Sequence, residues 1–110
     1  MDDVDERQGH LLRALSMAIS LLESDSFDER WAEDLRQLKS RVEAGDVWAL
    51  RDLRGKFGGN GSLNDLVLRN GPAGTLSDDE RKKVNRTFSN TLEKIWDDIE
   101  SLSRLLDMPN

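Results

Sequence analysis

The chain has 110 residues, enough for one small domain, and its formal net charge is −6. It contains no cysteine, which excludes disulfides, thiolate zinc sites and cysteine nucleophiles, and its acidity argues against direct nucleic-acid binding. The acidic first residues differ from a secretory signal, and no apolar run approaches the roughly 20 residues of a membrane span. We therefore expect a soluble, cytoplasmic protein with a single domain over residues 1–110.

The first predicted helix runs from about Val4 to Glu23, where apolar residues recur at helical spacing. The broad apolar face predicts contact with more than one neighbouring helix. His10 is the only histidine of the chain and falls at the polar edge of this helix, so we assign it no catalytic role. The residues of the apolar face are Val4, Leu11, Leu12, Leu15, Ala18, Ile19 and Leu22.

A second helix is predicted after Ser24-Asp25, because Ser26 and Glu29 have the spacing of a capping box. Gly45 is expected to end it in a left-handed conformation. The inward residues of this helix are Phe27, Trp31, Leu35, Leu38 and Val42.

Asp46 is predicted to cap a third, shorter helix. Its inward residues are Val47, Leu50, Leu53 and Phe57, and Trp48 falls outside that stripe.

The segment from Gly55 to Gly74 differs in kind, because it holds six of the eight glycines. Such density indicates backbone that needs positive φ or a close approach to another element. We expect Ser62 and Asp65 to cap a single helical turn, in preference to an isolated strand at 66–68, and Asn64 and Asp65 to bond loop amides. The predicted loop motif consists of Gly58, Gly59, Gly61, Ser62, Asn64 and Asp65.

Within this segment, Phe57-Gly58-Gly59-Asn60-Gly61-Ser62-Leu63-Asn64-Asp65-Leu66 resembles the signature of a family of small, mostly uncharacterised bacterial helical proteins. Its members read aromatic-Gly-Gly-Met-Gly-Ser-Phe-Asn-Asp-Leu near the middle of the chain. Here Asn60 stands in place of Met and Leu63 in place of Phe, so the polar part of the motif is kept. The resemblance implies a bacterial origin and a similar fold, and it brings no activity with it.

The last third of the chain, Leu76 to Met108, predicts one long amphipathic helix opened by a capping box of Ser77 and Glu80. Its stripe must be covered by other apolar surface, so the predicted fold is all-α, with three helices, a glycine-rich insert and this long helix. The stripe residues are Val84, Phe88, Leu92, Ile95, Ile99, Leu102 and Leu106, and the polar face carries Arg86, Asn90, Glu93, Asp97, Glu100 and Arg104.

No catalytic constellation, metal-ligand set or cofactor motif emerges from the sequence. The glycines lack the order of a phosphate-binding loop, and the Asn60–Gly71 run lacks the glycine and glutamate of a calcium loop. We therefore expect neither an enzyme nor a cofactor or metal.

The remaining candidate is a surface on the last helix. Glu93, Asp97 and Glu100 share its outer face, which is either an ordinary solvated face or an acidic strip for a basic partner. Trp96 beside them is either a core edge or an interface anchor. The leading hypothesis is a small bacterial protein-binding protein, an immunity protein that neutralises a toxin by direct binding. The alternative is a small ligand-binding domain or enzyme centred on the Gly58–Asp65 loop.

Overall fold

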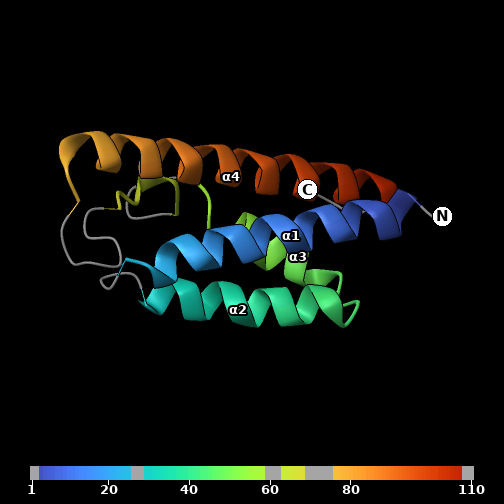
Figure 1. The fold of residues 1–110 in the computed structure, drawn as a ribbon. Helices are drawn as coiled ribbons and strands as arrows, with labels where there is room; N and C mark the ends of the chain where they lie inside the picture. The colour runs from blue at the N-terminus through green and yellow to red at the C-terminus, as the bar shows by residue number, and fades with distance from the viewer. Residues whose placement is uncertain (1–2, 26–28, 59–62, 69–75, 108–110) are drawn as a thin grey trace.

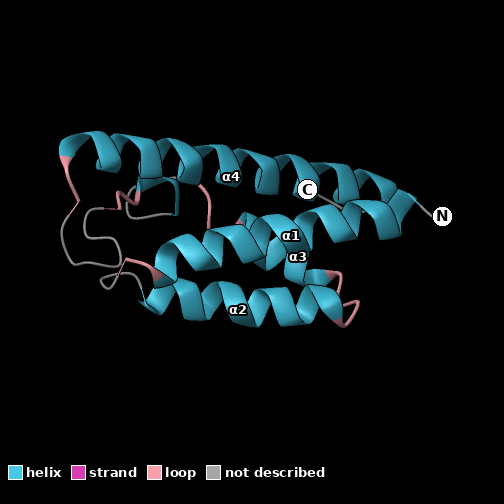
Figure 2. Cartoon of the chain, viewed as in Figure 1, coloured by secondary structure: helices cyan, strands magenta, loops and turns pink. Residues whose placement is uncertain are grey.

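The computed structural model describes residues 3–25, 29–58, 63–68 and 76–107. Every regular element in these ranges is helical, as Figure 2 shows, so the predicted all-α fold with a long C-terminal helix is confirmed. Half of the predicted glycine-rich insert (residues 59–62 and 69–74), including Gly59, Gly61 and Ser62, lies outside the described residues. The elements are α1 (Asp3–Glu23), α2 (Glu29–Glu43), α3 (Trp48–Arg54), a 3₁₀ turn η1 (Leu63–Asp65) and α4 (Asp78–Leu105).

Helix α1 is the centre of the bundle. It runs antiparallel to α4 and packs against α2 on its other side, while α3 packs against α2 and α4 (Figure 1). This arrangement explains the broad apolar face predicted for α1, since that face must meet two helices at once. Its buried residues are Leu11, Ala14, Leu15, Ala18, Ile19 and Leu22.

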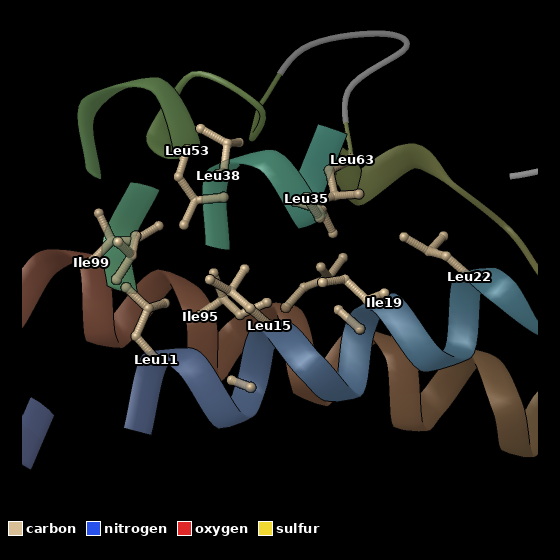
Figure 3. Close-up of a cluster of buried hydrophobic side chains, with 14 of the residues drawn as sticks. Leu11, Leu15, Ile19, Leu22, Leu35, Leu38, Leu53, Leu63, Ile95 and Ile99 are labelled. Atoms are coloured by element: carbon tan, nitrogen blue, oxygen red, sulfur yellow. The ribbon is translucent and has the colours of Figure 1, made fainter. Parts of the chain in front are cut away.

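One core joins the four helices. Figure 3 shows leucine and isoleucine side chains from α1, α2, α3 and α4, together with Leu63, pointing toward a shared interior. Leu15, Leu35 and Ile99 are fully buried there. At roughly 1.5–3 kcal/mol for each fully buried side chain of this size, the core is the main source of stability.

The α2–α3 connection ends α2 as predicted, but the N-cap residue of α3 is Val47, which makes no side-chain cap bond, and not Asp46 as predicted. Gly45 has φ +83°, and the amides of Gly45 and Asp46 donate to the carbonyls of Val42 and Arg41, which closes α2 as a Schellman motif. The Asp46 carboxylate accepts a hydrogen bond from the amide of Trp48 at 3.0 Å. The inward position predicted for Val47 is wrong, because α3 begins after it and leaves Val47 39% exposed.

Helix α4 begins with the predicted capping box. The Ser77 hydroxyl accepts from the amide of Glu80 at 3.2 Å, and the Glu80 carboxylate accepts from the amide of Ser77 at 3.1 Å. Its apolar stripe is buried from Phe88 to Leu102, with Val84 and Leu106 partly buried at its two ends. The helix ends at Leu105, before the predicted end at Met108, which lies outside the described residues.

The chain between α3 and α4 contains the predicted single turn, since η1 occupies Leu63–Asp65 and no strand forms at 66–68. Leu63 and Leu68 on either side of the turn are buried in the core. Ser26 of the predicted Ser26–Glu29 capping box and Phe27 of the predicted inward stripe lie outside the described residues. Over the described ranges, no helix has both the length and the apolar character that crossing a membrane requires.

Candidate binding groove

A groove of about 950 Å³ lies between residues 81–97 of α4 and the segment that runs from the end of α3 through η1. Phe88 and Leu92 are nearly fully buried and form its base, whereas Val67 and Trp96 are 51% and 37% exposed and form its rim. The other apolar lining residues are Phe57 and Leu66, and the polar ones are Gly58, Asn64, Arg81, Lys82, Asn85, Ser89, Glu93 and Asp97.

The wall opposite α4 is fixed by side-chain hydrogen bonds to backbone. Asn85 on α4 donates to the carbonyl of Leu68 at 2.9 Å and accepts from the amide of the same residue at 2.8 Å. A planar amide therefore satisfies both backbone groups of one residue, much as a neighbouring strand would. Asn85 is the anchor that positions this wall.

The two described ends of the loop motif meet at the edge of the groove. The Asn64 side chain accepts from the amide of Gly58 at 2.9 Å, the kind of bond predicted for this residue, and Gly58 has φ +84°. The amide of Leu63 donates to the carbonyl of Lys56 at 2.8 Å, which closes the loop. Of the six predicted motif residues, Gly58 and Asn64 line the groove, and Asp65 is exposed on η1.

Trp96 lies at one end of the groove, where its ring packs against an aromatic and a cationic side chain. Its ring lies 5.4 Å from the ring of Phe57, tilted by 57°, and the Arg54 guanidinium lies 5.8 Å from its centroid. Phe57 and Arg54 both pack against the indole, which remains 37% exposed. Trp96 is therefore both an edge of the core and an exposed aromatic surface.

The three predicted carboxylates do not form one strip. Glu93 and Asp97 line the groove beside Trp96 and have no salt bridge with any described residue. Glu100 instead pairs with Arg54 at 3.1 Å and is outside the groove. The expectation that all three face open water therefore fails for Glu100, because α3 brings a cation against it.

The opposite end of the groove is basic. Arg81 and Lys82 lie in the second turn of α4, about three to four helical turns from Glu93 and Asp97. Arg81 is already paired with Asp78 at 3.6 Å, while Lys82 makes no salt bridge within the described chain. The groove is thus apolar along its base and oppositely charged at its ends.

Other charged groups are engaged in the fold. His10 shares a hydrogen bond with Arg13, with 3.3 Å between Nδ1 and Nη2. Asp98 is buried, and burial raises the pKa of its carboxyl, partly offset by the hydrogen bond from Arg7 at 3.4 Å. No group of three or more metal-binding side chains comes together among the residues with described positions.

No groove position was assigned from the sequence to Asn85 or to the side chains of Phe57, Leu66 and Val67; the predicted third helix includes Phe57 as an inward residue, but α3 ends at Arg54, before it. Asn85 did carry a signal, because it sits at the margin of the apolar stripe, one turn before Ser89 and next to Val84. The other three could not be placed without knowing where the segment before α4 packs.

Residues 23–75 match the family model described as "Domain of unknown function (DUF6966)". The matched region spans α2, α3 and η1 and includes the loop motif, whereas most of α1 and all of α4 lie outside it. No curated protein and no solved structure matches the chain.

Proposed function

We propose that this protein is a small bacterial interaction protein that binds a basic protein partner in the α4 groove, and that its role is to neutralise a toxin as an immunity protein. The observation that carries the proposal is the half-exposed Trp96 flanked by Glu93 and Asp97 at the mouth of an apolar groove.

Tryptophan is enriched among the few residues that dominate binding energy at interfaces. Here the indole is already held by Phe57 and Arg54, so little side-chain entropy remains to be lost when a partner covers it. This preorganised aromatic surface is suited to anchor a complex.

The two carboxylates supply a different part of the binding free energy. Glu93 and Asp97 are not neutralised by the described part of the fold, and the net charge of −6 adds a longer-range attraction for a basic protein. Such charges mainly raise the association rate, while desolvated contacts such as Trp96 lower the dissociation rate.

The groove also supports a second candidate function, the binding of a small ligand. Its volume of about 950 Å³ falls within the range of about 300–1,000 Å³ common for ligand pockets. Gly58 and Asn64 at its edge would then contact the ligand.

The test is capture of the product of the neighbouring gene, since an immunity gene is expected beside its toxin. Glu93→Lys combined with Asp97→Lys should lower the association rate and flatten its salt dependence, and Trp96→Ala should raise the dissociation rate. The control for the charge change is Glu33→Lys with Glu43→Lys, which changes the net charge equally on exposed positions of α2 and replaces surface pairs with Arg36 and Lys39 there.

Failure of the wild-type protein to capture that product would count against the immunity function. Equal kinetics for the groove variant and the α2 control would remove the groove from the proposal. A small molecule that protects the protein thermally, with protection lost in Asn64→Ala, would favour the ligand-binding candidate.

A further inference from the structure

We infer that the partner segment received by the groove is an amphipathic α-helix that lies antiparallel to α4, with a basic N-terminal end beside Glu93 and Asp97. The inference rests on the proposed function and specifies the occupant of the same site.

The length of the groove suits a helix of ordinary size. Its lining on α4 extends from Arg81 to Asp97, which is about 24 Å at the helical rise of 1.5 Å per residue. A partner helix of about 16 residues spans that distance. Phe88 and Leu92 in the base of the groove and Trp96 at its rim follow one another at single-turn intervals of α4, so the apolar floor runs parallel to the axis of that helix, as a groove for a partner helix requires.

The backbone of the groove favours a helix over an extended peptide. An extended peptide needs main-chain partners, because its own amides and carbonyls are unpaired. Both backbone groups of Leu68 are already bonded to Asn85, and the amide of Leu66 donates to the carbonyl of Leu63 at 3.3 Å. The main chain of α4 is bonded within its own helix. A helix satisfies its own backbone, so it can enter this groove without main-chain partners from the groove.

The charges fix the direction of the helix. Glu93 and Asp97 attract basic side chains, and Lys82, together with the paired Arg81, attracts acidic ones. The dipole of a helix adds to this preference, because its N-terminus is positive and its C-terminus negative. A helix with its N-terminus beside Asp97 and its C-terminus beside Lys82 places both its charged side chains and its dipole favourably. Such a helix runs antiparallel to α4.

The test uses two labelled synthetic peptides of about 18 residues, enough to span the groove as a helix. Both carry the same leucine stripe and the same composition; one has Lys in its first two turns and Glu in its last two, and the other has the reverse order. Fluorescence anisotropy at low salt is measured with wild-type protein and with a charge-swapped variant, Arg81→Glu, Lys82→Glu, Glu93→Lys and Asp97→Lys.

The Lys-first peptide should bind the wild type about tenfold more tightly than the Glu-first peptide, and the charge-swapped variant should invert that order. The preference is expressed as the ratio of the dissociation constants of the two peptides. Comparing this ratio between the wild type and the charge-swapped variant cancels the different helix propensities of the peptides. Circular dichroism verifies the fold of the variant, and Glu93→Lys with Asp97→Lys alone serves as a milder version that should abolish the preference.

A third peptide, the Lys-first sequence with a central proline, separates a helix from an extended chain and should bind at least about tenfold more weakly. Equal binding of the proline peptide, or of both charge orders, overturns this inference. If Glu93→Lys with Asp97→Lys still weakens the binding of the Lys-first peptide in that case, the proposed function, a groove that binds a basic partner, stands. Binding that is the same in every variant overturns both.

Discussion

Asn85→Ala is the substitution that most directly tests how the groove is built. It removes the side chain that bonds both backbone groups of Leu68 and leaves α4 itself intact. Because Leu68 is only 1% exposed, its amide and carbonyl cannot turn to bulk water without moving the segment off α4.

The expected cost follows from the two groups left without a partner. A buried donor or acceptor that loses its partner costs about 1–3 kcal/mol, and partial entry of water at the half-buried Asn85 position reduces the sum to about 2–4 kcal/mol. At about 4–8 °C per kcal/mol for a domain near 100 residues, the melting temperature should fall by about 8–32 °C.

The matched control is Asn90→Ala, at an exposed position of the same helix. Both substitutions bring the same gain in helix propensity, so their difference isolates the bonds to Leu68. Urea denaturation measures the global effect, and hydrogen exchange at the Leu68 amide measures the local opening. Equal urea midpoints for the two variants would refute the conclusion that Asn85 anchors the groove wall.

Three further predictions concern the rest of the fold. Ile99→Ala should destabilise the protein by about 2–5 kcal/mol in urea, while Glu93→Ala should change it by less than about 0.5 kcal/mol; similar midpoints would mean that the assigned face of α4 is wrong. Gly45→Ala should cost about 1–2 kcal/mol because φ is +83°, whereas Gly9→Ala, inside α1 with room for a Cβ, should stabilise by about 0.5–1 kcal/mol; stabilisation by both would contradict the left-handed C-cap. Because burial raises the pKa of Asp98 in the folded state, its ionisation lowers stability as the pH rises from the unfolded pKa through the folded one. Asp98→Asn should therefore gain stability over the wild type between acidic and neutral pH in paired thermal melts, and a wild type that is the more stable at pH 7 would reverse that sign.

The helices of this protein are largely readable from its sequence because their signals are local. Apolar spacing along α1 and α4, the Ser77–Glu80 capping box and the left-handed Gly45 each depend on a few neighbouring residues. The prediction for Val47 failed because a sequence locates the start of a helix only to within one or two residues. A shift of one residue at the start of α3 changes which side chain faces inward.

The groove could not be predicted from the sequence, because the segments that form its two walls are far apart in the chain. Asn85 meets Leu68 across 17 residues of sequence, and Phe57 meets Trp96 across a longer separation still. An asparagine beside an apolar stripe is equally compatible with a solvated position. Only the packing of the segment before α4 turns it into an anchor, and that packing follows from the burial of Leu63 and Leu68.

The same reasoning separates residues that looked equivalent on a helical wheel. Glu93, Asp97 and Glu100 share one face of α4, yet among the described residues only Glu100 meets a cation from another helix. Arg54 bonds Glu100 at 3.1 Å and Ser103 at 3.3 Å while its guanidinium lies over the ring of Trp96. Reversing Glu100 to lysine would set two cations side by side and disturb the support of the tryptophan, so a loss of binding would mix a structural effect with a lost contact. Glu93 and Asp97 have no salt bridge with any described residue. Reversing these two alone therefore isolates the contribution of charge to partner binding.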